Sequence, residues 1–148
     1  MPRQIPHFLQ PNDYYCGPAV LQMTLAAFRI GMTQVEIARQ VHTTKKDGTA
    51  QSDMRTFLKK YFPKARVRQR MSLPQLQKAL RQDVVVIVNF TEPVDNVGHY
   101  AIVKKITQQE IILLDPLYRK PFVMKLGDFS LRWHSGDSTF QRWCAVVK

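Results

Sequence analysis

A cysteine, a histidine and an aspartate are spaced along this chain in a way that suits nucleophilic chemistry. Cys16 follows a polar, turn-prone segment and directly precedes an apolar helical pattern, which places its thiol at the start of a helix. Unpaired backbone N–H groups and the positive end of the helix dipole favour an anion there, and the thiolate is the nucleophilic form of cysteine. His99 and Asp115 provide a base and a carboxylate that can orient it.

His99 opens one predicted strand and Asp115 ends the next strand of the same predicted hairpin. Antiparallel neighbours lie about 4.8 Å apart, so the two side chains can meet at the sheet edge. The imidazole would take the proton of the thiol, and the third group would hold the ring in the right tautomer. Gln10 lies upstream of Cys16, and its amide could donate to a developing oxyanion together with the Cys16 backbone N–H.

Helical periodicity dominates the first half of the chain. Thr33 and Ser72 each begin a pattern typical of a capping box, which predicts a helix start at both positions. Gly31 is expected to end the first helix. Helices are expected over residues 16–28, 33–41 and 52–61 and from about 72, with a loop at 43–50.

The second half reads as strands. Residues 84–90 form a continuous run rich in β-branched residues, as expected for a buried central strand. Helices first and strands later favour an α+β domain, in which an N-terminal helical half packs on a C-terminal antiparallel β-sheet and the site lies in the groove between them. We expect residues 1–148 to form a single domain. Further strands are expected over 66–70, 99–106, 110–114, 121–125 and 142–147.

The chain is strongly basic, with 22 Lys and Arg against 11 Asp and Glu and a net charge of +11. Such a charge favours anionic partners: acidic peptides, nucleic acid or an anionic membrane surface. The densest basic stretch, residues 59–70, alternates with apolar residues as a solvated strand face does, and no nucleic-acid-binding signature accompanies it. Nucleic acid is therefore the least expected of these partners, and a plain basic surface that binds none of them is the alternative.

The two cysteines have no CxxC spacing, which argues against a zinc site or a disulfide framework. Cys144 lies in an apolar run and is interpreted as a core residue. The longest apolar run, residues 84–88, is too short to cross a membrane, and the N-terminus lacks the apolar core of a signal peptide. The cytoplasm is therefore the expected location. No metal or organic cofactor is expected, because the thiol supplies the nucleophile.

The order of these motifs resembles that of the C39-type cysteine peptidases, papain-like proteins named for the bacteriocin-processing peptidase domain. Gln10, five further residues and Cys16-Gly17 are followed by Gly-His-Tyr at 98–100 and by Asp-Pro at 115–116. Residues 13–18, Asp-Tyr-Tyr-Cys-Gly-Pro, further resemble the signature of stand-alone C39-like domains. The best-known members are fused to an ABC transporter and cut after a Gly-Gly leader, which is often acidic.

The resemblance implies a papain-like fold and a role for each of four residues. Cys16 would be the nucleophile, His99 the general base and then the general acid, and Asp115 the group that orients the imidazole. Gln10 would be the oxyanion donor. The resemblance extends directly from Gln10 to Pro116, and the remaining C-terminal strands also suit a papain-like sheet.

Three more residues are expected to contact or border the substrate. Gly17 would allow close packing next to the nucleophile, and Gly98 would leave room for the substrate backbone beside His99. Tyr15 would line the groove. Either glycine alternatively serves a turn, and Tyr15 alternatively belongs to the core.

We therefore expect a cysteine peptidase or amide hydrolase that acts on peptides. The Cys16 thiolate would attack a carbonyl, the His99 imidazolium would protonate the leaving amine, and water would hydrolyse the thioester. The main alternative is a catalytically silent C39-like domain that binds a leader or partner peptide. Transpeptidation and deamidation use the same thiol chemistry and stay open.

Overall fold

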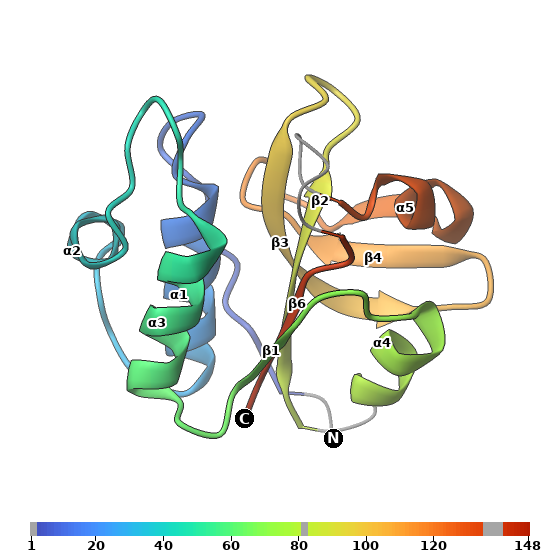
Figure 1. Ribbon diagram of the computed structural model, residues 1–148, viewed down its shortest axis with the longest axis horizontal. Coiled ribbons are helices and arrows are strands. Elements are labelled where there is room, and N and C mark those ends of the chain that lie inside the picture. The colour runs from blue at the N-terminus through green and yellow to red at the C-terminus, as the bar shows by residue number, and fades with distance from the viewer. Residues whose placement is uncertain (1–2, 81–82, 135–140) are drawn as a thin grey trace.

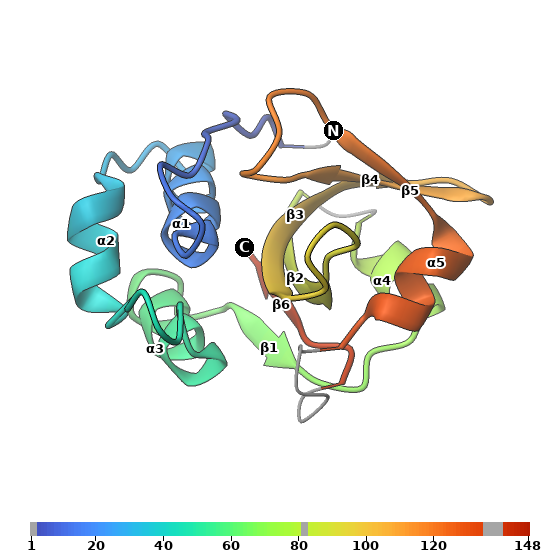
Figure 2. The ribbon, with the colours of Figure 1, turned by 90° about the horizontal axis from the view of Figure 1, so that it is seen from above.

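The computed structural model describes residues 3–80, 83–134 and 141–148. A group of helices lies on one side of a β-sheet, and two further helices lie on the other side (Figures 1 and 2). The helices are α1 (Cys16–Ala27), α2 (Gln34–Gln40), α3 (Gln51–Tyr61), α4 (Leu73–Ala79) and α5 (Leu126–Arg132). The strands are β1 (Arg66–Arg68), β2 (Val85–Thr91), β3 (Gly98–Ile106), β4 (Glu110–Leu114), β5 (Phe122–Lys125) and β6 (Cys144–Val147).

Within the described residues the strands form one sheet in the order β1-β6-β2-β3-β4-β5, and every pairing is antiparallel. The last strand of the chain, β6, lies inside the sheet between β1 and β2. The strands β2, β3 and β4 follow each other directly, so their connections are short hairpins. These hairpins bring residues from 89 to 115 into one region of the sheet.

Apolar side chains pack on both faces of the sheet. Along β2, Val85 and Ile87 belong to the cluster shared with α1 and α3, whereas Val86 and Val88 belong to the cluster that includes α4 and α5. Successive side chains of a strand point to opposite faces, so a strand covered on both sides has no polar alternation. This explains why all of β2 is buried.

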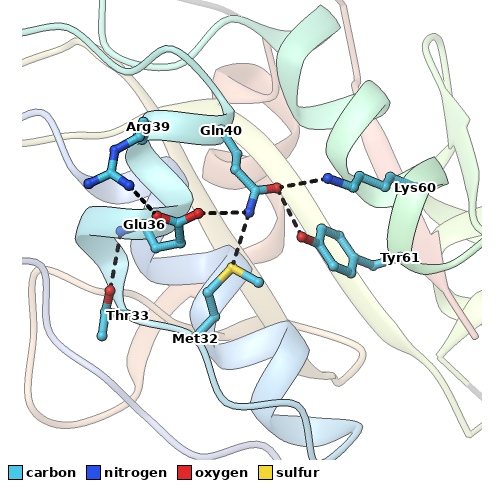
Figure 3. Close-up of polar contacts among 7 residues, drawn as sticks. All are labelled: Met32, Thr33, Glu36, Arg39, Gln40, Lys60 and Tyr61. Carbon is cyan, nitrogen blue, oxygen red and sulfur yellow. Dashed lines mark hydrogen bonds and ion pairs between the residues drawn. The ribbon is translucent and has the colours of Figure 1, made fainter.

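The outer helix α2 is held against α3 by polar contacts around Gln40 (Figure 3). Gln40 Oε1 accepts hydrogen bonds from the Tyr61 hydroxyl (2.9 Å) and Lys60 Nζ (3.5 Å) of α3. On its own helix, Gln40 Nε2 donates to Glu36 Oε1 (3.3 Å). At the start of α2 the Thr33 hydroxyl accepts from the Glu36 N–H, so the predicted cap is present.

The first helix ends earlier than the sequence suggested. It stops at Ala27, and Arg29 rather than Gly31 takes the left-handed conformation that closes the helix, with φ of 63°. The Arg29 N–H donates to Ala26 O and the Ile30 N–H donates to Leu25 O, which satisfies carbonyls of the last turn. The prediction of Gly31 as the stop is therefore wrong.

The structure confirms the predicted fold class, a helical half packed on an antiparallel sheet. The strands expected over 66–70 and 142–147 are shorter than predicted, because they end at Arg68 and begin at Cys144. Helix α5 was not predicted, since Phe129 is its only buried residue and Gly127 weakens its helical pattern. Among the described residues, no helix has both the length and the apolar character needed to cross a membrane.

Candidate active site

A cleft of about 710 Å³ lies between the helical half and one end of the sheet. The segment before α1, the loop at 45–50 and the first residue of α3 contribute to one wall. The ends of β2 and β3 contribute to the other wall. Its lining includes three of the four predicted catalytic residues, Gln10, Cys16 and His99, and two amides that were not predicted, Gln51 and Asn89.

Cys16 is the first residue of α1 and is half-buried. The first hydrogen bond within the helix runs from the Ala19 N–H to Tyr15 O (3.0 Å), and Tyr15, the N-cap residue, makes no side-chain cap among the described residues. The first turn of α1, all of which the structure describes, also contains no acidic side chain. The Cys16 N–H and the positive end of α1 are therefore available to stabilise negative charge that forms near the sulfur.

His99 and Asp115 form a buried pair, with 4% and 1% of their side chains exposed. His99 Nε2 lies 2.6 Å from Asp115 Oδ1. His99 is the second residue of β3, and Asp115 directly follows β4, which pairs with β3 through Ile102 and Leu114. The Phe90 ring packs edge-on against the imidazole, with centroids 5.8 Å apart. With Nε2 bound to Asp115, Nδ1 is the ring nitrogen that remains for Cys16.

The Asp115 turn is fixed by contacts on both sides. Asp115 Oδ1 also accepts from the Leu117 N–H (2.9 Å), so one oxygen serves both the ring and the backbone. His7 Nε2 lies 2.9 Å from the Asp115 carbonyl oxygen, and the Gln10 N–H donates to Pro116 O at 2.9 Å. The segment before α1 therefore holds the turn that carries Asp115.

The electrostatics of the site keep the imidazole protonated. Burial lowers the pKa of His99, but hydrogen bonds with Asp115 and then with Cys16 outweigh it and raise the pKa to about 10. Burial also raises the pKa of Tyr100 well above its usual value. The Tyr100 hydroxyl therefore stays protonated and donates to Thr49 O at 2.9 Å, which ties β3 to the loop before α3.

Gln10 lies in the same cleft as Cys16, and its amide has hydrogen-bonding groups that are not used. Its Nε2 donates to Asn12 O at 2.6 Å, and a primary amide nitrogen carries a second hydrogen. Its Oε1 is buried and has no hydrogen-bond partner among the described residues. The structure thus brings Gln10 and Cys16 together, while the role of Gln10 as an oxyanion donor stays a prediction.

The three expected substrate-contact residues have different positions. Gly98 lines the cleft directly before His99. Gly17 is buried beneath the loop before α3: a Cβ at this position would lie 2.5 Å from Thr49 Oγ1, so only glycine lets the two segments approach. The neighbouring Tyr14, not Tyr15, is among the residues that line the cleft. Contact of these residues with substrate stays a prediction.

Two polar side chains of the cleft were missed from the sequence. Gln51 begins α3, and Asn89 interrupts the apolar residues of β2. A lone asparagine inside a run of buried residues is a signal that could have pointed to Asn89, because buried polar groups in strands need a reason. Gln51 carries no comparable signal in the sequence. Among the described residues, no group of three or more His, Cys, Asp or Glu is arranged to hold a metal ion.

A family model provides the deciding comparison: the model described as Peptidase C39 family matches residues 4–137. The chain belongs to the Peptidase C39 family. Membership agrees with the resemblance seen in the sequence. No curated protein sequence matches the chain significantly.

Solved structures of C39 peptidase domains share the fold. A putative C39-like peptidase from Bacillus anthracis superposes with a TM-score of 0.78 at 16% identity, covering 99% of this chain and 95% of that one. The peptidase domain of Streptococcus ComA, a bifunctional ABC transporter involved in quorum sensing, gives 0.73 at 18% identity, covering 97% and 98%. A double glycine motif protease from an AMS/PCAT transporter, solved with its leader peptide, gives 0.73 at 16% identity, covering 99% and 94%.

Proposed function

We propose that this chain is an active cysteine peptidase that hydrolyses peptide bonds in its cleft, with residues 1–148 acting as one C39-like domain. The observation that carries the proposal is the position of His99, which is bound to Asp115 on one nitrogen and lines the same cleft as Cys16. A protonated imidazole beside the sulfur stabilises negative charge on it. The same proton is then available for a leaving amine.

The reaction follows from these positions. The Cys16 sulfur attacks the carbonyl carbon, and the oxyanion receives hydrogen bonds from the Cys16 N–H and the Gln10 amide. His99 gives its proton to the leaving nitrogen as the C–N bond breaks, which leaves a thioester on Cys16. His99 then takes a proton from water, the hydroxide attacks the thioester, and the acid product and the thiolate are released. Asp115 holds the ring orientation throughout.

Peptides are the substrates that the family and the cleft favour. One relative of the same fold was solved with a leader peptide, and its printed description is that of a double glycine motif protease. The net charge of +11 over the whole chain and the position of Lys45 and Lys46 at the cleft suit an acidic peptide, although Asp13, Asp47, Glu92 and Asp95 line the cleft too. We therefore propose peptide segments with a Gly-Gly pair and nearby acidic residues as the first substrates to test.

The test is cleavage of a defined peptide set, analysed by mass spectrometry. The set combines synthetic peptides that contain Gly-Gly with a proteome-derived peptide library. Wild type should cleave at defined bonds, Cys16→Ala and His99→Ala should lose turnover, and Cys144→Ala should keep it because Cys144 is buried within the sheet. Full cleavage by Cys16→Ala would refute the proposal. Binding without cleavage in wild type would instead support a silent peptide-binding domain.

A further inference from the structure

Gln51 is a buried side-chain amide that has no hydrogen-bond partner in the part of the chain that the structure describes. It is the first residue of α3, lines the cleft and is only 9% exposed. Neither its Nε2 nor its Oε1 has a hydrogen-bond partner among the described residues. Buried polar atoms are nearly always paired, since an unpaired one loses its hydration without compensation. A side chain that keeps both a donor and an acceptor unpaired inside a cleft is prepared for a ligand.

A second amide faces the same cleft from the sheet. Asn89 of β2 is 6% exposed, and its Oδ1 has no partner among the described residues. Asn89 is opposite Tyr100 in the β2–β3 register, and the Tyr100 hydroxyl donates to Thr49 O, two residues before Gln51. This hydrogen bond joins the two walls close to both amides. Gln51 and Asn89 therefore belong to one cleft that also contains Cys16.

The chemistry of Gln51 selects its ligand. An anion would satisfy Nε2 and leave Oε1 unpaired, whereas a cation would satisfy Oε1 and leave Nε2 unpaired. A residue of an extended peptide presents its own N–H and C=O to the same side, so it satisfies both atoms. We propose that Gln51 binds the backbone N–H and C=O of one residue of an extended substrate peptide, with Asn89 Oδ1 accepting from a further N–H. This inference rests on the proposed function, because it assumes that a peptide occupies the cleft.

The test measures how fast Cys16 reacts with a probe that needs no turnover. The probe is an epoxysuccinate with diglycine amides on both carboxyl groups, so that a peptide extends to either side of the sulfur. The Cys16 sulfur bonds to an epoxide carbon, the C–O bond breaks and the alkoxide takes a proton. The rate constant is divided by that for iodoacetamide on the same variant, which removes changes in the reactivity of the thiol itself.

Gln51→Met should lower this ratio about tenfold, the loss expected when two hydrogen bonds of ordinary net strength disappear. Gln69→Met is the matched control, because Gln69 is exposed on the chain after β1 and should keep the native ratio. A second probe carries N-methylglycine in place of glycine. The factor by which N-methylation slows the reaction should be at least threefold smaller in Gln51→Met than in wild type, since the acceptor for that N–H is gone.

Three results would overturn the role of Gln51. The rate ratio could be the same in Gln51→Met as in wild type, or N-methylation could slow both proteins equally. Wild type could also react with the diglycine probe no faster than with epoxysuccinamide, which has no peptide arms. Removal of an unpaired buried amide should leave the melting temperature unchanged or higher, whereas a structural Gln51 would lower it. If Gln51→Met fails to fold, Gln51→Glu keeps the shape and the acceptor and should still lose the contact made by Nε2. Fast labelling without peptide hydrolysis would reject the proposed peptidase activity while supporting this site.

Discussion

Replacing Asp115 by Asn tests what keeps His99 protonated. Asn keeps the side-chain shape and an oxygen that can accept from His99 and from the Leu117 N–H, but it removes the negative charge. A hydrogen bond to a charged group contributes about 1.5–3 kcal/mol, and one pKa unit corresponds to about 1.36 kcal/mol. The pKa of His99, about 10 in the native chain, should therefore fall by about 1–2 units.

The assay is an NMR titration of the histidine ring C–H signals, with His99 assigned from its loss in His99→Ala. Asp53→Asn is the matched control, because Asp53 lies 3.2 Å from the exposed His42 and should leave the titration of His99 unchanged. If His99 titrates at the same pH in Asp115→Asn as in wild type, the carboxylate does not stabilise the imidazolium. An ion pair between Asp115 and a protonated His99 would then be refuted.

Three further results are expected. The pKa of His99 is raised from 6.5 to about 10, so its contribution to stability is complete below about pH 6.5 and is lost as pH rises toward 10. Chemical denaturation over this pH range should show that the free energy of unfolding falls by at most about 5 kcal/mol. An unchanged free energy of unfolding would contradict the raised pKa. Gly17→Ala should destabilise the fold by about 1–3 kcal/mol through its clash with Thr49, whereas Gly127→Ala, which meets open space, should not; equal thermal unfolding shifts would refute the clash. Burial raises the pKa of Cys144 to about 12, so peptide mapping should find it unmodified by iodoacetamide until the protein unfolds, and rapid modification would contradict its burial.

The meeting of Cys16, His99 and Asp115 could be anticipated because it depends on short-range rules. A turn-prone segment before an apolar pattern fixes a helix start, which determines where Cys16 lies. Two strands joined by a tight connection become antiparallel neighbours, so residues at their facing ends approach each other. These rules hold whatever the rest of the fold does, and the predicted α+β architecture followed from the same local patterns.

Contacts that depend on the path of the whole chain could not be anticipated. His7 reaches the Asp115 carbonyl because the segment before α1 runs across the sheet edge, a path that no local pattern encodes. The two unpaired amides, Gln51 and Asn89, are ordinary residues of a helix and a strand until both walls of the cleft are known. Helix α5 was not predicted because a seven-residue helix with one buried side chain has almost no hydrophobic periodicity.

The place of β6 inside the sheet has a consequence for protein synthesis. Residues 144–147 are translated long after Cys16, yet they fill the gap between β1 and β2 and pair with both. Until they emerge from the ribosome, β2 has an open edge and the sheet that supports His99 is incomplete. If the chain is the peptidase proposed above, a nascent chain would therefore reach full activity only after β6 has paired with β1 and β2.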